Sequence, residues 1–239
     1  SDRAAYRLAD QFDQDVLGYL SGFKQSALHG ASDTVNATVN GSVAVSTAAT
    51  NELLATMLVD ANDFNGGTAG NSIVAVPRAG GDGLNTTTAK ASPLSIIARM
   101  SRKLDQQNVD TSGRWLVIDP VFAELLQDED SRLMNADFGG AGLQNGLILN
   151  NVHGFKVYMS NNLPAVGNGA TGATATGSTH YGVIVGGHSS AVATADSINK
   201  TETYRDPDSF ADIVRGMHMY GRKILRPEAL SRAYYVSGY

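Results

Sequence analysis

The sequence predicts a protein of the α+β class. Three observations carry this prediction: an amphipathic helical pattern over residues 1–25, a helix–strand–helix order over residues 92–126, and an alternating strand pattern over residues 213–226. Apolar residues spaced three and four apart indicate a helix, whereas apolar residues at every second position indicate a strand. The sequence has no internal repeat period, so a solenoid or propeller is not expected.

Residues 1–25 form the first predicted element, a long amphipathic helix. Its apolar stripe consists of Leu8, Phe12, Val16, Tyr19 and Phe23, at steps of four, four, three and four residues. A long helix whose pattern starts at the first residue leads us to expect that another segment precedes it.

The middle of the chain contains the clearest boundaries. Ser92 is a predicted N-cap and Pro93 the first residue of a helix, a position that proline favours. The apolar residues of 94–104 keep helical spacing, residues 115–118 are a predicted buried strand, and Asp119-Pro120 begins a second helix.

Shorter patterns complete the assignment. We expect a short helix at 51–60, a turn at Asn40-Gly41, and surface loops at the residues rich in Gly, Asn, Thr and Ala. The loops are 65–90, with a short apolar piece at 73–76, and 165–179. Further strands are expected at 147–159 (interrupted at Gly154), 181–185 and 213–226.

The composition excludes several classes of protein. The 239 residues contain no Cys, which rules out disulfide frameworks, thiolate metal sites and cysteine nucleophiles and fits a reducing cytoplasm. The net charge of -5 gives no basic footprint for tight nucleic-acid binding. No run of about 18 apolar residues occurs, so no membrane span is expected.

One motif resembles the nucleophile site of serine hydrolases. Gly187-His188-Ser189-Ser190-Ala191 follows an apolar strand, and Asp212 and His218 come later in the order of that family's triad. Ala191 stands where the motif has its second glycine, and His218 lies within an alternating strand pattern. We therefore keep a serine hydrolase that uses Ser189 only as a minor alternative.

The other motifs have stronger structural explanations. Residues 172–179 have the glycine spacing of a phosphate-binding loop, but Ser178 replaces the required lysine. Residues 80–83 lack dinucleotide-binding spacing, residues 60–71 lack the ligands of a calcium loop, and the acidic run 128–130 is expected to be solvated. Surface ion pairs are the favoured explanation for Arg222, Arg226 and Arg232, with phosphate or an acidic neighbour as the alternative. We predict no catalytic, cofactor-binding or metal-binding residues and no enzymatic activity.

Three stretches after residue 92 follow one another in a distinctive order. They are Lys103-Leu104-Asp105-Gln106-Gln107-Asn108-Val109 with Gly113-Arg114-Trp115-Leu116-Val117-Ile118-Asp119-Pro120, then residues 145–164, and then Gly216-Met217-His218-Met219-Tyr220-Gly221-Arg222-Lys223-Ile224-Leu225-Arg226-Pro227-Glu228-Ala229-Leu230. In their order and spacing these stretches resemble the major capsid proteins of tailed double-stranded DNA bacteriophages. The opening helix with Arg3-Ala4-Ala5-Tyr6 is similar to that family's long spine helix. Members of the family often have a proline near the position of Asp110, and this chain has none.

The resemblance implies the fold and its division into domains. It implies a peripheral (P) domain in residues 1–92 with the spine helix at 1–25, and an axial (A) domain in residues 93–195. Residues 196–239 would return to the peripheral domain as strands. The family's N-terminal arm and extended E-loop would precede the spine helix.

The resemblance also implies a structural role. Pentamers and hexamers of identical subunits would form an icosahedral virion capsid that encloses double-stranded DNA without sequence-specific binding and without a membrane. Assembly would take place in the cytoplasm of the bacterial host, with scaffolding, portal and decoration proteins as candidate partners and no cofactor. A second alternative is an encapsulin-type nanocompartment shell, which shares the fold and encloses protein cargo.

Overall fold

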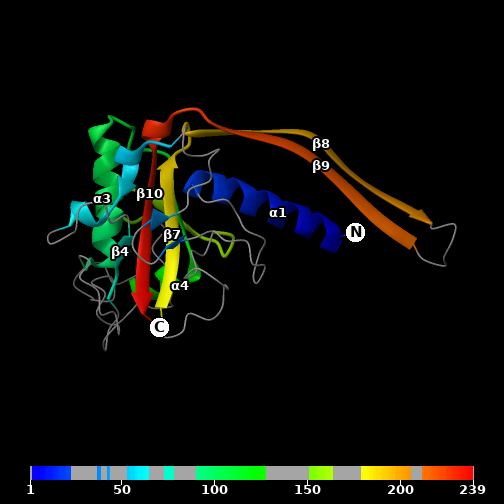
Figure 1. The fold of residues 1–239 in the computed structure, drawn as a ribbon. Coiled ribbons are helices and arrows are strands. Elements are labelled where there is room, and N and C mark those ends of the chain that lie inside the picture. The colour runs from blue at the N-terminus through cyan, green and yellow to red at the C-terminus, as the bar shows by residue number, and fades with distance from the viewer. Residues whose placement is uncertain are drawn as a thin grey trace.

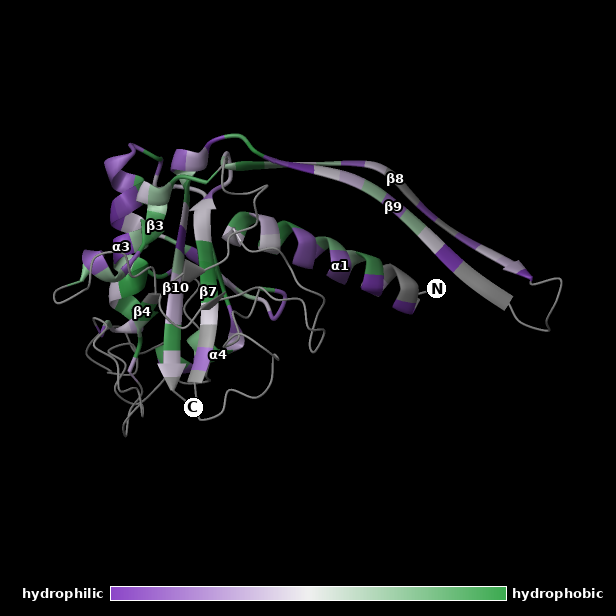
Figure 2. Cartoon of the chain, in the orientation of Figure 1, coloured by the Kyte–Doolittle hydropathy of each residue, from purple (hydrophilic) through white to green (hydrophobic). Residues whose placement is uncertain are grey.

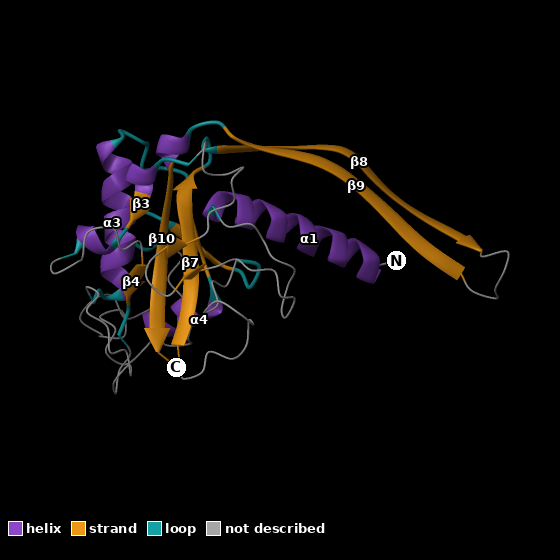
Figure 3. Ribbon diagram, in the orientation of Figure 1, coloured by secondary structure: helices purple, strands orange, loops and turns teal. Residues whose placement is uncertain are grey.

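The computed structural model describes nine stretches of the chain. They are residues 2–22, 37–38, 42–43, 53–64, 73–77, 90–127, 151–163, 179–205 and 212–238. These stretches form a body with a mixed β-sheet, and a long two-stranded arm that extends from it beside one helix (Figure 1). The α+β prediction is confirmed, since helices and mixed sheets both occur (Figure 3).

The body is built around a six-stranded sheet. Its strands are β3 (Leu58–Val59), β4 (Ile73–Ala75), β5 (Arg114–Ile118), β6 (Lys156–Met159), β7 (Thr179–His188) and β10 (Leu230–Gly238). The order is β3-β10-β7-β5-β6, with β4 also paired to β10. Strands β3 and β4 run parallel to β10, β6 runs parallel to β5, and β7 is antiparallel to both of its neighbours. Strands that lie far apart in the sequence therefore meet in one sheet.

Two helices supply most of the body's helical core. Helix α3 (Pro93–Gln106) begins where the sequence predicted, because the Oγ of Ser92 accepts a hydrogen bond from the N–H of Ser95. Helix α4 (Pro120–Gln127) follows β5 directly. The buried residues of these helices and of the sheet form a single core, with Ile96, Ile97, Met100, Leu104, Leu116, Ile118 and Phe122 fully enclosed. Hydrophobic residues are accordingly concentrated in the body (Figure 2).

The segment at residues 53–63 differs from the prediction. The sequence predicted a short helix at 51–60, whereas the described part holds a 3-10 turn, η1 (Ala55–Met57), followed by β3 and a second 3-10 turn, η2 (Ala61–Asp63). The backbone N–H and C=O groups of β3 pair with β10 and so are not free to form the hydrogen bonds of a helix. Ser231 of β10 also donates a hydrogen bond to the carbonyl of Met57.

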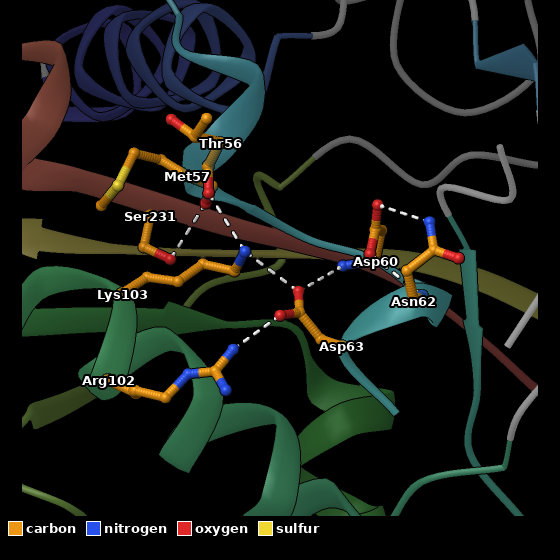
Figure 4. A network of polar contacts seen from close by, with 8 residues as sticks. All are labelled: Thr56, Met57, Asp60, Asn62, Asp63, Arg102, Lys103 and Ser231. Atoms are coloured by element: carbon orange, nitrogen blue, oxygen red, sulfur yellow. Dashed lines mark hydrogen bonds and ion pairs between the residues drawn. The ribbon is translucent and has the colours of Figure 1, made fainter. Parts of the chain in front are cut away.

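Ion pairs and hydrogen bonds connect the same segment to α3. The carboxylate of Asp63 accepts a hydrogen bond from Arg102 at 2.7 Å and lies 3.0 Å from the Nζ of Lys103 (Figure 4). Lys103 also donates to the carbonyl of Thr56 at 3.0 Å. Asp60 caps η2 by accepting the N–H of Asn62. These contacts hold residues 55–63 on the side of α3 that faces the edge of the sheet.

The remaining strand predictions agree with the structure, with longer strands in places. Strand β7 extends the predicted strand 181–185 to Thr179–His188, and β9 (Asp212–Ile224) occupies most of 213–226. Of the predicted strand 147–159, residues 151–159 are described, and there Lys156–Met159 is extended after a tight turn at His153 and Gly154, whose φ angles are 50° and 82°. Strands β1 (Ala37–Thr38) and β2 (Ser42–Val43) form a hairpin around Asn40-Gly41, although the turn residues lie outside the described stretches.

Candidate functional site

The three residues of the hydrolase hypothesis do not come together. Ser189 is exposed in the turn between β7 and β8 (Val192–Arg205), so the strand leads into another strand rather than into the helix of a nucleophile elbow. His218 pairs with Asn199 in the arm, about 20 Å along the hairpin from Val192, at roughly 3.3 Å per residue. Its Nε2 atom contacts Asp196 at 2.8 Å, and Asp212 pairs with Arg205 at the far end of the arm. This geometry gives the hydrolase alternative no support.

The other motifs hold no ligand site in the described structure. Asp60, Asn62 and Asp63 are engaged in capping η2 and in binding α3. Within the described ranges, no group of three or more His, Asp or Glu side chains gathers closely enough to hold a metal ion. Residues 80–83, 128–130 and 171–178 lie outside the described stretches. None of the helices described is long and apolar enough to cross a bilayer.

The C-terminal arginines are engaged within the chain. Arg222 forms an ion pair with Asp15, and Arg226 pairs with Glu228 at 2.9 Å, as the surface-pair interpretation expected. Arg232 differs, because it is buried and donates to the hydroxyl of Tyr234 and the carbonyl of Leu54. Alternation along β10 did not reveal this, since one of the two partners, the carbonyl of Leu54, lies 178 residues away in the sequence.

The most distinctive feature of the surface is the arm with its helix. The arm consists of β8 and β9, a two-stranded antiparallel hairpin that pairs from Val192–Ile224 to Arg205–Asp212 and has one bulge, between Asp196 and Ile198. Helix α1 (Asp2–Ser21) lies along one face of the arm (Figure 1). A two-stranded hairpin is marginally stable alone in water, so this helix is a necessary part of the arm's support.

The predicted apolar stripe of α1 packs mainly on the arm. Phe12 contacts the rings of His218 and Tyr220, with centroids 5.5 Å and 4.7 Å apart. Leu8 fills the space above Gly216, where a Cβ atom would lie 2.8 Å from its Cδ1 atom. The helix ends at Ser21, and Gly22 follows with a φ of 85°, a conformation that glycine favours after a helix.

Polar contacts fix the register of α1 on both sides. Toward the arm, Asp15 accepts a hydrogen bond from the hydroxyl of Tyr220 at 2.8 Å and pairs with Arg222, whose guanidinium lies 4.8 Å from the centre of the Tyr19 ring. Burial raises the pKa of Tyr220 and lowers the pKa of Arg222.

Toward the body, the amide of the buried Gln14 donates to Asp10 and to Asn162. Asn162 in turn donates to Asp10 at 2.9 Å. The helix therefore couples the arm to the body.

Replacing Arg222 by Ala is expected to lower the free energy of unfolding by about 1–2 kcal/mol. The variant loses a partly buried ion pair and a cation–π contact, each of which contributes about 0.5–1 kcal/mol. Arg222→Lys, which keeps the charge without the planar stacking group, is expected to lose about half as much. Urea unfolding followed by circular dichroism measures both.

The matched control for this prediction is Arg215→Ala. Arg215 also combines an ion pair, with Glu202, and a stacking contact, with Tyr204, but its side chain is 67% exposed and it lies on the face away from α1. We expect its loss to be smaller. Equal losses for the two variants would show that α1 does not stabilise the arm.

Comparison with known proteins gives a consistent family assignment. A family model described as "Phage capsid protein" matches residues 48–233, which is most of the chain. A search of curated proteins gives no match.

Solved structures show the same fold. A structure from Mycobacterium phage Che8 aligns with a TM-score of 0.57 and 24% identity, covering 97% of this chain and 60% of that one. The asymmetric unit of the bacteriophage PhiM1 mature capsid aligns with a TM-score of 0.54 and 15% identity, covering 98% of this chain and 63% of that one. This chain thus spans less than two thirds of the length of either structure, and at these identities the likeness establishes the fold alone.

Proposed function

The chain belongs to the phage capsid protein family, and from this premise we propose that its copies assemble as pentamers and hexamers into an icosahedral shell around double-stranded DNA. The observation that supports this best is the match of the family to residues 48–233, which include the whole arm and the sheet of the body apart from the last part of β10. The role in a capsid is structural, and the proposal needs no catalytic residue, metal or cofactor.

The shape of the subunit supports the proposal. The body is compact, whereas α1 and the arm extend away from it and offer a large surface relative to their mass (Figure 1). A segment of this kind suits contacts with identical neighbours, because α1 lies on one face of the arm and no other described element covers the opposite face. The net charge of -5 suits a shell protein that encloses DNA without binding it tightly.

The two parts suggest how the subunit is placed in a shell. We assign the α1–arm unit to the peripheral domain. We assign the body, including residues 53–64, 73–77 and 230–238, to the axial domain, because β3, β4 and β10 lie in one sheet with β5 and β7. The division into 1–92, 93–195 and 196–239 remains a prediction, and this assignment refines it. Scaffolding, portal and decoration proteins, and assembly in the bacterial cytoplasm, belong to the same proposal.

Cryo-electron microscopy of particles that contain this chain tests the proposal. We expect icosahedral shells in which copies of the chain occupy both five-fold and six-fold clusters, with DNA density inside. Small shells that hold protein cargo would overturn the enclosure of DNA. Finding the chain only on the outside of a shell built from another protein would overturn the role as the shell subunit.

A further inference from the structure

The arm has one face that its own helix does not cover. His218, Tyr220 and Arg222 point toward α1, so the alternate residues of β9 point away from it. Directly paired residues of an antiparallel hairpin share a face, which places the partners on β8 on the same side. We call this the outer face of the arm, and it comprises Ala193, Lys200, Glu202, Tyr204, Arg215, Met217, Met219 and Lys223.

The outer face combines apolar and basic groups. Met217 and Met219, neighbouring side chains on this face, are 51% and 52% exposed, and Tyr204, nearer the tip of the arm, is 44% exposed. Around them the basic side chains Lys200 and Arg215 outnumber the one carboxylate of this face, Glu202, which pairs with both. The face therefore suits a partner with an aromatic group and an unpaired acid.

The opposite side of the same unit offers such groups. Tyr6, Asp10 and Asp13 are spaced at helical intervals of four and three residues, on the side of α1 away from the arm. Tyr6 is 71% exposed. Among the described residues no cation lies within ion-pair distance of Asp13, and partial burial and the nearby carboxylate of Asp10 raise its pKa. Asp10 lies between Tyr6 and Asp13 but is held by Asn162 of the body and by Gln14, so we call Tyr6 and Asp13 the free face of α1.

We propose that the outer face of the arm binds the free face of α1 in a second copy of this chain. In this contact Met217 and Met219 pack against Tyr6, a sulfur–aromatic pairing that proteins favour, and Lys200 and Arg215 face Asp13. The two surfaces lie on opposite sides of the unit formed by α1 and the arm, so the contact is head-to-tail. Head-to-tail contacts form rings where the rotation closes. The inference rests on the proposed shell function and names the surface through which neighbouring copies meet.

Two sets of variants test the contact in the full chain. The pair Met217→Ser and Met219→Ser is expected to weaken self-association, measured by analytical ultracentrifugation and particle counts, by at least about tenfold. Lys200→Glu and Asp13→Lys are each expected to weaken it. Their combination in one chain should restore most of the loss, because every copy presents both faces. The matched controls are Met159→Ser and Lys156→Glu, exposed residues of β6 in the body, which should leave self-association unchanged.

Thiol cross-linking gives a measurement that does not depend on the strength of assembly. The chain has no Cys, so a Tyr6→Cys chain mixed with a Met219→Cys chain carries one thiol on each partner. A short bismaleimide should link the two different chains, and a mixture of Tyr6→Cys with Met159→Cys should not be linked. Links between two Met219→Cys chains alone would show a face-to-face contact and overturn the proposal.

The outcomes separate this inference from the shell function. Wild-type assembly that survives every arm and helix variant overturns the inference and leaves the shell function standing. A wild-type chain that forms no assembly in infected cells overturns the shell function itself. Thermal unfolding by circular dichroism confirms that each variant is folded, which is expected because the replaced side chains are exposed.

Discussion

Replacing Asp119 by Ala is expected to lower the free energy of unfolding by about 3–5 kcal/mol, because two hydrogen-bonding partners and a helix cap lose their acceptor. Asp119 is 7% exposed and lies between β5 and α4. Its carboxylate accepts the hydroxyl of Tyr235 at 2.6–2.7 Å and lies 2.9 Å from the Nε2 of His180. It also caps α4 by accepting the N–H of Phe122.

The large expected loss of stability follows from the number of elements that the Asp119 carboxylate connects. Tyr235 is fully buried in β10, and His180 lies near the start of β7, so one side chain links three strands and the beginning of a helix. A buried donor without an acceptor destabilises the folded state by about 1–3 kcal/mol, because it has lost its hydrogen bonds to water. Loss of the helix cap adds about 1 kcal/mol. Asp119→Asn keeps an acceptor for the cap and is expected to lose less.

Urea unfolding followed by the fluorescence of Trp115, the sole tryptophan of the chain, measures this loss next to the site. The matched control is Asp110→Ala, which removes a similar bond from the exposed carboxylate to the N–H of Ser112. We expect a much smaller loss there because water replaces the carboxylate. A variant Asp119→Ala as stable as the wild type would show that the polar network does not hold the strands together.

The second large effect is expected from Gly182→Ala. A Cβ atom at residue 182 would lie 2.4 Å from Cε1 and 2.6 Å from the hydroxyl of Tyr235. The ring cannot move aside at low cost, since it is fully buried, packs on Phe122 with centroids 5.0 Å apart, and donates to Asp119. Inserting atoms into a packed core typically costs about 1–3 kcal/mol, and this overlap belongs at the upper end.

The control for this substitution is Gly221→Ala in the arm, where nothing lies within 4 Å of the added atom. Its stability should match or slightly exceed that of the wild type, because alanine loses less chain entropy in a strand. Gly182→Ala combined with Tyr235→Leu should recover part of the loss, and a double-mutant cycle gives the coupling. Equal stabilities of the two alanine variants would contradict the packing described for the ring.

Local patterns predicted the elements where capping and periodicity act over a few residues. Ser92 caps α3 and Asp119-Pro120 begins α4 as expected, and the spacing of Leu8, Phe12 and Tyr19 identified α1. The helix expected at 51–60 was wrong because the backbone of β3 pairs with β10 instead. The two segments are far apart in the sequence, since Ser231 lies 174 positions after Met57. Propensity over a short window cannot register a partner so distant.

By itself, the sequence determined the class of the fold, the main helices and strands, the absence of cysteine chemistry and the resemblance to tailed-phage capsid proteins. The tertiary structure decided which surfaces those elements cover. Alternation in β9 shows that Met217 and His218 lie on opposite faces, but only the position of α1 decides that His218 is covered and Met217 is exposed. Likewise Asp119 reads as a helix cap, and its partners His180 and Tyr235 are 61 and 116 residues away. Such contacts form because burial stabilises two groups that meet in the core, however far apart they are in the sequence. The residues next to each group in the sequence therefore do not reveal its partner.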